Sequence, residues 1–160
     1  MRCFRLAIFV SSLALVIWTS RVSPSNGFFS VEAPEGWDLT QSADVFYWIS
    51  KDAHASITAS LLNEQLTPAQ VGEIIKDKGF RKTTSGDRPF HGFPCFYTEG
   101  NSSSLDQQAV IYYCRVRRDN QHWSVFLFYT VDSAYQRAYS PLLDQFLNSF
   151  AWDPYVKKDR

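Results

Sequence analysis

The sequence predicts an α+β fold: a central antiparallel sheet of five to seven strands with helices on both faces, arranged as a three-layer α/β/α sandwich. Three observations lead to this prediction. Residues 93–130 have the alternation and the turn residues of three consecutive antiparallel strands. The last of these strands, 122–129, is apolar on both faces, which is typical of a central strand covered on both sides. Two amphipathic helical segments, 67–79 and 141–150, are available to provide the cover.

The N-terminal region has the features of an export signal. Two arginines precede an apolar run from Leu6 to Trp18, which has the length of a secretory h-region and is short for a membrane span. We predict that residues 1–25 are a cleaved signal peptide or an N-terminal anchor, with membrane contact only through an uncleaved segment at 4–20. In both cases the folded part is exported and is periplasmic or secreted.

The rest of the chain has the length of one domain. We expect residues 26–152 to form a single globular unit and the polar residues 153–160 to be a C-terminal tail that frays. Sixteen basic residues balance sixteen acidic ones, so the net charge gives no reason to expect nucleic acid as a partner.

The first part of this domain reads as strands. A short strand at 27–33 ends at the turn Pro34-Glu-Gly-Trp37, and a polar break at 40–44 separates this turn from a strand at 45–49. The next strand, 53–61, alternates small or apolar residues with polar ones.

Two features of the 53–61 strand lead to expectations. Ala55 and Ala59 lie on its apolar side and leave room for the helix that follows. His54 lies on its polar side, where we interpret it as a solvated residue rather than a ligand.

The segment 67–79 carries helix signals in the expected order. Thr67 is the N-cap, Pro68 occupies the first helical position, and Gly79 follows the last turn. A strand at 80–84 then leads into the three-strand region.

Within that region the turn residues fix a register. A reversal centred near Ser104 places Cys95 opposite Cys114 on one face, and a second reversal at 118–121 begins the central strand. After export these two cysteines form an even pair in an oxidising compartment, which favours a disulfide. Free thiols, or a metal site that adds His91 and His122, are the alternatives, although the spacing is not a standard zinc pattern.

The C-terminal part is predicted to be helical. Residues 132–139 form a first helical segment, and Ser140 and Pro141 have the residue types of a new helix start. Trp152 is expected to close the end of this helix. The apolar stripe that packs on the sheet consists of Leu142, Leu143, Phe146, Leu147 and Phe150.

The order of these elements resembles the PsbP-like superfamily. The resemblance rests on Phe29-Ser-Val-Glu-Ala-Pro-Glu-Gly-Trp37, on Thr67-Pro68 at a helix start, and on Pro141-Leu-Leu-Asp-Gln-Phe-Leu-Asn-Ser-Phe150. The superfamily includes lumenal extrinsic proteins of photosystem II, a Ran-binding nuclear transport factor and many bacterial envelope proteins. The resemblance implies a central antiparallel sheet with helices on both sides, and a protein that binds other proteins without catalysis.

No motif predicts an enzyme. The sequence lacks Gly-x-Ser-x-Gly, His-Glu-x-x-His and a Gly-rich phosphate loop, its three histidines are scattered, and no catalytic residue, metal or cofactor is expected. The clearest charged feature is a possible basic patch able to hold phosphate, an acidic polysaccharide or an acidic protein surface, with a solvated face as the alternative. Its members are Arg115, Arg117, Arg118, Arg81, Lys82 and Arg88.

Two functional hypotheses follow. The preferred one is an exported, non-catalytic accessory protein that binds an unidentified envelope or secreted protein. The alternative is a small-ligand or metal-binding protein that uses a groove between sheet and helix.

Overall fold

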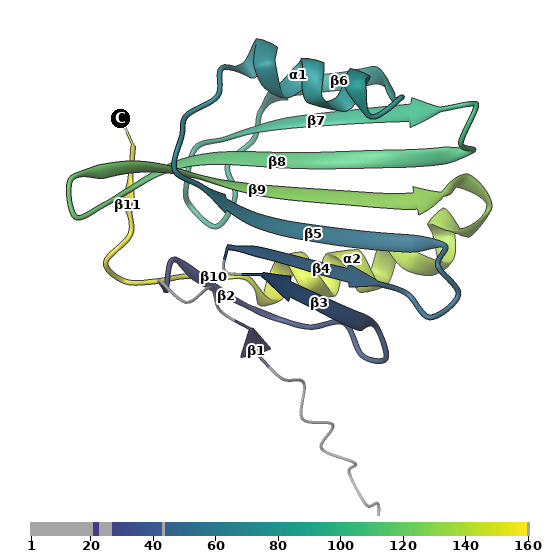
Figure 1. Ribbon diagram of the computed structural model, residues 1–160, viewed down its shortest axis with the longest axis horizontal. Coiled ribbons are helices and arrows are strands. Elements are labelled where there is room, and N and C mark those ends of the chain that lie inside the picture. The colour runs from purple at the N-terminus through teal and green to yellow at the C-terminus, as the bar shows by residue number, and fades with distance from the viewer. Residues whose placement is uncertain (1–20, 23–26, 43, 160) are drawn as a thin grey trace, which may run out of the picture.

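The structure is a computed structural model that describes residues 21–22, 27–42 and 44–159 (Figure 1). Most of the predicted export signal at 1–25 lies outside these residues. Within the described part of the chain, none of the helices has both the length and the hydropathy needed to cross a bilayer.

Short strands at both ends of the chain flank a long antiparallel region. In chain order the elements are β1 (Arg21–Val22), β2 (Phe29–Glu32), β3 (Asp38–Ser42), β4 (Val45–Ile49), β5 (Ala55–Leu62), α1 (Pro68–Asp77), β6 (Arg81–Asp87), β7 (Cys95–Ser102), β8 (Gln107–Arg118), β9 (Gln121–Asp132), the 3₁₀ turn η1 (Ser133–Tyr135), α2 (Gln136–Ser149), β10 (Ala151–Trp152) and β11 (Lys157–Lys158).

The main sheet has eight strands, which exceeds the predicted five to seven. Seven follow the order β3-β4-β5-β9-β8-β7-β6, and the short β11 pairs with β8. The strand predicted at 27–33 is present as β2, but it leaves the main sheet and forms a separate three-stranded sheet with β1 and β10. The segment 40–44, which we expected to be a polar break, belongs largely to β3 at the edge of the main sheet. Polar residues are tolerated there because an edge strand faces water.

The predicted register of the central strands is confirmed. Cys95 lies directly opposite Cys114, and the two form a disulfide with Cα atoms 4.2 Å apart. The second reversal is a two-residue turn in which Asp119 and Asn120 have φ of 51° and 63°. Such turns require positive φ at both positions, which Asp and Asn tolerate better than most residues. β9 is therefore central, between β5 and β8.

The side chains of β9 contribute to two separate cores. Val125 and Leu127 belong to the larger core, together with Phe146 of α2, while Phe126 belongs to a smaller core with Ile75 of α1. Because side chains alternate across a strand, the two helices lie on opposite faces of the sheet. Figure 1 shows α2 behind β4 and β5, and α1 near β6 and β7. Each helix covers only part of its face, so full helical layers on both faces are not confirmed.

The helix start signals of α1 are confirmed, and one inference about its packing is wrong. The Oγ1 atom of Thr67 accepts a hydrogen bond from the Gln70 N–H, and the Gln70 side chain accepts one from the Thr67 N–H. Ala55 and Ala59, however, belong to the core that contains α2 rather than to the one that contains α1. The connection after β5 carries the chain to the other face, so the helix that follows in sequence is not the one that packs on the alanines.

The C-terminal helix does not restart at Ser140. α2 runs unbroken from Gln136 to Ser149 with Pro141 inside it, and the Ser140 hydroxyl donates to the Gln136 carbonyl instead of capping a new helix. Pro141 removes one backbone hydrogen bond. Burial of the predicted stripe, in which Phe146 and Phe150 are each 2% exposed, offsets this loss.

The C-terminal residues do not fray as predicted. Val156 is buried, and Lys157 and Lys158 pair with Arg117 and Val116 of β8. The cause is the unequal length of neighbouring strands: β7 pairs with β8 only as far as Cys114, which leaves the last residues of β8 with an open edge that β11 occupies. The predicted role of Trp152 is confirmed, since its ring lies 4.9 Å from that of Phe150 at the end of α2.

Candidate functional site

A cluster of basic residues lies where β11 joins β8. We call it the basic end of the sheet, and its cations are Arg115, Arg117 and Lys157 on one face and Arg118 and Lys158 on the other. Lys157 is the direct cross-strand neighbour of Arg117. Like charges directly opposite each other on adjacent strands repel and destabilise the pair.

The repulsion between Arg117 and Lys157 is not relieved by nearby acids. Both side chains are exposed, and among the described residues neither forms an ion pair. Two acids line the hollows beside the pair: Asp119 bridges Arg118 at 3.7 Å, and Asp159 is engaged by Gln65 and by His122, whose Nδ1 lies 3.1 Å from an Asp159 oxygen. Burial tends to raise the pKa of Asp159, but these hydrogen bonds lower it below its usual value. The Arg117–Lys157 pair therefore favours an anionic group from outside the chain.

Two solvent-open hollows of about 670 and 330 Å³ flank the pair, and both are lined by Arg117 and Lys157. The smaller one also includes Tyr155, whose side chain is 73% exposed. Aromatic and arginine side chains are enriched at protein interfaces, and the openness of the hollows suits an extended chain better than an enclosed small molecule. The surface can therefore bind a segment that carries carboxylates.

The six residues of the predicted basic patch do not come together. Arg81 and Lys82 lie opposite Asn101 and Gly100, which places them about 20 Å along the sheet from Arg115 at the usual rise per residue. The other four residues, all arginines, do not share one face of the sheet.

Arg88 and Arg118 project from the face opposite Arg115. The guanidinium of Arg88 stacks on Tyr97, 3.9 Å from the ring centroid. Arg118 lies over Phe28 and donates to the Gly27 carbonyl at 2.9 Å. Cross-strand contacts thus hold these cations in place.

Sequence reasoning missed the two lysines of the basic end. Lys157 and Lys158 lie in the segment that we expected to fray, so they were not considered as neighbours of Arg117. One feature of the sequence could have indicated their position. Val156 is an apolar residue within a polar stretch, and such a residue can anchor a short strand to the core.

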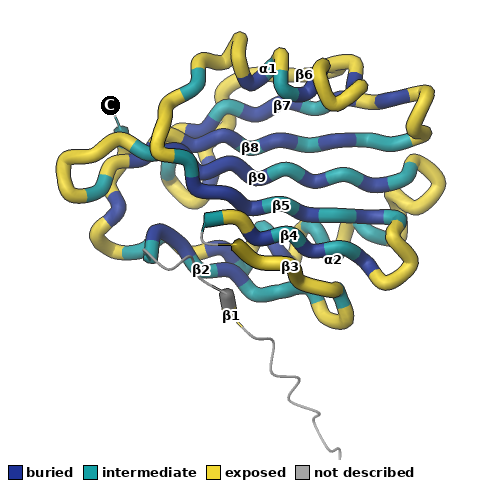
Figure 2. Tube along the Cα trace, viewed as in Figure 1, coloured by how far each residue is buried: buried dark blue, intermediate teal, exposed yellow. Residues whose placement is uncertain are grey.

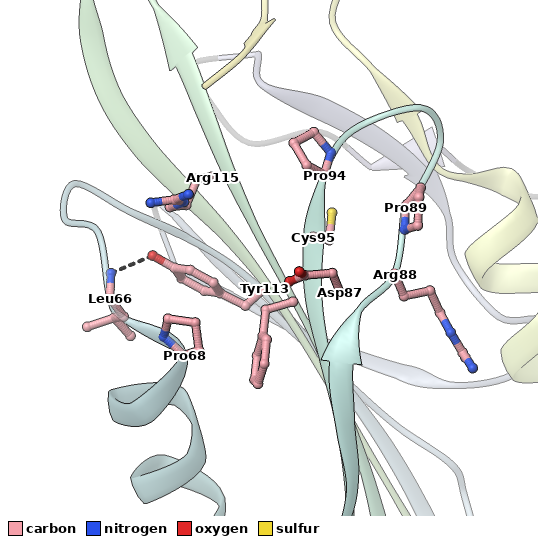
Figure 3. A pocket seen from close by; sticks show the side chains of 10 residues that line it. Leu66, Pro68, Asp87, Arg88, Pro89, Pro94, Cys95, Tyr113 and Arg115 are labelled. Carbon is pink, nitrogen blue, oxygen red and sulfur yellow. Dashed lines mark hydrogen bonds between the residues drawn. The ribbon is translucent and has the colours of Figure 1, made fainter. Parts of the chain in front are cut away.

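Two hollows correspond to the predicted groove between sheet and helix, and the wider one, of about 760 Å³, is an open surface along α1 and the first residues of β6. A pocket of about 190 Å³ lies between the start of α1 and strands β6 to β8 (Figure 3). Tyr113 and Arg115 line one side and Asp87 the other, while the side chain of Arg88 points away. The Tyr113 hydroxyl is already bonded to the Leu66 N–H and to Ser124. The volume is below the range of typical ligand sites, so the pocket gives little support to ligand binding.

The alternative metal site is not formed. Both cysteine sulfurs are joined in the disulfide, and Nε2 of His91 lies 2.7 Å from the carbonyl oxygen of Leu147. Within the described residues, no group of three or more His, Cys, Asp or Glu side chains is placed to hold a metal ion.

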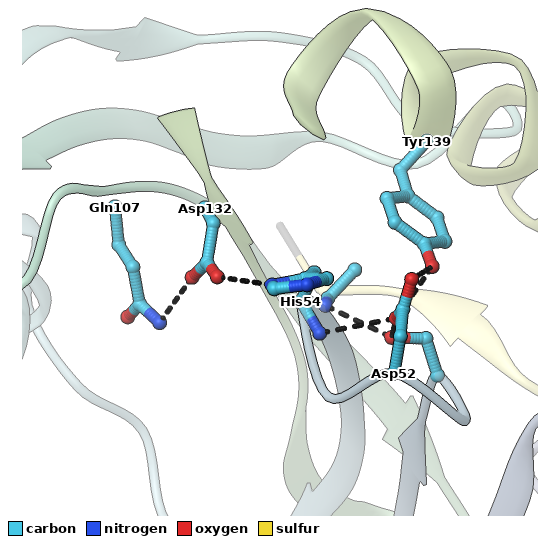
Figure 4. Close-up of polar contacts among 7 residues, drawn as sticks. Asp52, His54, Gln107, Asp132 and Tyr139 are labelled. Carbon is cyan, nitrogen blue, oxygen red and sulfur yellow. Dashed lines mark hydrogen bonds and ion pairs between the residues drawn. The ribbon is translucent and has the colours of Figure 1, made fainter. Parts of the chain in front are cut away.

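His54 is not the solvated residue that we expected. Its Nδ1 lies 2.6 Å from an Asp132 oxygen, and its ring stacks on Tyr135 at 3.7 Å (Figure 4). The other Asp132 oxygen accepts a hydrogen bond from Gln107 at 2.8 Å. The hydrogen bond from His54 is the main cause that lowers the pKa of Asp132. His54 directly precedes β5 and lies beside Asp132, the last residue of β9. The sequence pattern alone does not reveal this partner.

A second carboxylate extends this cluster to α2. Asp52 accepts hydrogen bonds from the hydroxyls of Tyr139 and Ser50, and these lower its pKa to about 2 (Figure 4). An Asp–His pair is also part of hydrolytic triads, which need a nucleophile bonded to the histidine. Among the described residues no hydroxyl or thiol bonds to the ring of His54. The cluster instead fastens the β4–β5 loop and the end of β9 to the start of α2.

Comparisons with known proteins identify the fold. No protein-family model matches the sequence, and no curated protein matches it either. The solution structure of the cyanobacterial PsbP of Synechocystis superposes with a TM-score of 0.62 at 11% identity and covers 88% of this chain and 96% of that one. The chain has the PsbP-like fold.

Two further structures agree with this assignment. LpqN, described as involved in cell envelope biogenesis of Mycobacterium tuberculosis, has a TM-score of 0.58 at 10% identity, over 88% of this chain and 91% of its own. A variant of the protein Mog1 has a TM-score of 0.53 at 14% identity, over 85% of this chain and 96% of its own. At these identities the PsbP-like likeness establishes the fold alone. The predicted resemblance is thereby confirmed at the level of the fold.

Proposed function

We propose that this chain is an exported, non-catalytic accessory protein that binds another envelope or secreted protein through the basic end of its sheet. The observation that carries the proposal is the Arg117–Lys157 pair, two exposed cations directly opposite each other, with no ion-pair partner among the described residues. A carboxylate placed between them would remove the repulsion and gain two charge-assisted contacts.

Export is supported by the disulfide and by the sequence of the leader. The bond joins two buried cysteines on neighbouring strands, and such bonds persist in oxidising compartments. LpqN, which shares the fold, is described as acting in cell envelope biogenesis. That likeness is one of fold, and it supports an envelope role for this chain only as an analogy.

The chemistry of the basic end indicates the partner. An acidic, extended segment fits an open surface that offers cations together with the exposed Tyr155 ring. Contacts between exposed charges weaken as salt screens them, over a distance of about 8 Å at physiological ionic strength. Binding should therefore weaken at high salt.

Affinity capture from the native envelope tests the proposal. The wild-type protein should recover one stoichiometric partner at low salt, and the double variant Arg117→Gln with Lys157→Gln should lose it. The matched control is Arg81→Gln with Lys82→Gln, which removes the same charge at the far end of the sheet and should retain the partner.

The outcomes separate a specific site from general attraction. Equal loss in both double variants would show that only total charge matters and would contradict the proposed site. Retention of the partner by Arg117→Gln with Lys157→Gln would also contradict it. Circular dichroism of each variant checks that the fold is intact.

A further inference from the structure

The two edges of the main sheet differ in their protection. β6, at one edge, has a register shift between Lys82 and Thr84 and carries the cations Arg81 and Lys82. Bulges and edge lysines are devices that prevent another strand from pairing. β3, at the other edge, pairs with β4 in an unbroken register over its full length.

β3 has few protective features. All five of its residues are exposed, including Leu39 at 41%, and the strand contains no proline, lysine or arginine. Backbone groups of alternate residues on an edge strand point away from the sheet, so β3 offers unpaired donors and acceptors to a further strand. The sheet face beside it is also open, because Tyr47 and Ile49 of β4 belong to neither core. Figure 2 shows β3 exposed along its length and α1 near the opposite edge of the sheet.

The β3–β4 hairpin itself carries acids and no basic residue, and the first cation that follows it is Lys51. Glu35 and Asp38 are exposed acids, and no lysine or arginine occurs between residues 33 and 50. A second copy of the chain would bring an equally acidic edge against this one. A basic strand would instead be attracted to it.

We propose that β3 is an acceptor edge onto which an extended, basic segment of a partner protein adds as a further strand. Main-chain hydrogen bonds would provide part of the affinity, and the acids at the edge would select lysine or arginine in the segment. This surface is separate from the basic end of the sheet and has the opposite charge, so it adds a second contact of a different kind.

A synthetic peptide tests the inference directly. The probe is a fluorescein-labelled nine-residue peptide in which lysines are spaced among alternating threonine and valine, titrated against the oxidised full chain by fluorescence anisotropy. Its matched control carries N-methyl groups on alternate residues, which removes ladder donors and keeps the charge and side chains. We expect the methylated peptide to bind at least about tenfold more weakly, since several main-chain hydrogen bonds are lost.

Protein variants locate the site. Asp38→Lys should weaken binding of the unmethylated peptide about tenfold, while Thr84→Lys at the β6 edge should leave it unchanged. Hydrogen exchange should show new protection of β3 amides in the bound state. Arg117→Gln with Lys157→Gln should retain peptide binding, so failure of the proposed basic site and failure of this edge are distinguishable.

Three results would overturn the proposal. Equal binding of the methylated peptide would indicate electrostatic attraction without strand addition. Protection confined to residues outside β3 would place the peptide elsewhere. Sedimentation of the unliganded protein as a dimer that Asp38→Lys alters, without peptide binding, would show that a second copy occupies the edge.

Discussion

The two faces of the main sheet differ in how much of them the chain covers. On the α2 face, the fourteen-residue helix, β2 and the C-terminal segment with Val156 enclose a core that extends from β4 to β7. On the opposite face, the ten-residue α1 covers a smaller core around Ile75 and Ile111 and leaves β3 to β5 open. The comparison shows that buried apolar side chains are concentrated on one face, which predicts that this face contributes more to stability.

Matched phenylalanine truncations should give the largest change in the free energy of unfolding. Phe146→Ala on the α2 face should cost about 4 kcal/mol, because it deletes a ring that is 2% exposed within the larger core. Phe128→Ala on the α1 face should cost about 2 kcal/mol, because that ring is only partly buried. Urea denaturation of both variants measures the difference. Equal costs would show that the two faces contribute alike.

Removal of the disulfide should have the next largest effect on stability. The bridge lies on the α2 face and joins residues 19 apart in sequence, so Cys95→Ala with Cys114→Ala should cost about 3 kcal/mol. Thermal unfolding of the double variant measures the loss, and reduced wild type is the control. An unchanged transition after complete reduction would contradict a stabilising role.

A smaller effect is expected where α1 approaches the sheet. A Cβ atom at Gly100 would lie 3.2 Å from Ile75 Cδ1 and 3.1 Å from the Arg81 carbonyl oxygen. Gly100→Ala should therefore displace the end of α1 and cost about 1 kcal/mol. Gly72→Ala in α1, whose added Cβ meets open space, is the control and should not destabilise. A stabilised Gly100→Ala protein would show that α1 shifts without cost.

The acid dependence of stability tests the polar link to α2. The pKa of Asp52 in the folded protein is about 2, below its ordinary value of 3.8, mainly because Tyr139 donates a hydrogen bond to the carboxylate. A lowered folded pKa contributes stability that is present above the unfolded pKa and is lost as the pH falls toward 2.

Two variants should reduce this dependence. Asp52→Asn and Tyr139→Phe should each flatten the loss of thermal stability between pH 4 and pH 2. Asp77→Asn, at the end of α1, is the matched control on the other face. A wild-type slope in the Asp52→Asn protein would contradict the assignment.

Local signals predicted the centre of the fold well. The turn near Ser104 and the alternation of the flanking strands were enough to place Cys95 opposite Cys114, because the turn sets which residues pair and the alternation puts both cysteines on one face. Thr67 and Pro68 likewise fixed the start of α1, since capping depends on adjacent residues.

The elements that were missed depend on residues outside their own segments. β3 is polar and becomes a strand only because β4 lies beside it, and β11 forms only where β8 extends beyond β7. Pro141 lies inside a helix because the buried stripe outweighs a local stop signal. The basic end was found only in part for the same reason: its lysines are brought to Arg117 by a pairing between residues 40 apart in sequence.

The docking of β11 has a practical consequence for handling the protein. A protease that cuts the exposed stretch around Tyr155 would release Lys157 and Lys158 together. It would also expose the part of the core that Val156 covers. A purification tag added to the C-terminus would follow closely after β11 and could occlude the same surface. Capture experiments should therefore use an untagged C-terminus, and intact mass should confirm that the last strand is still attached.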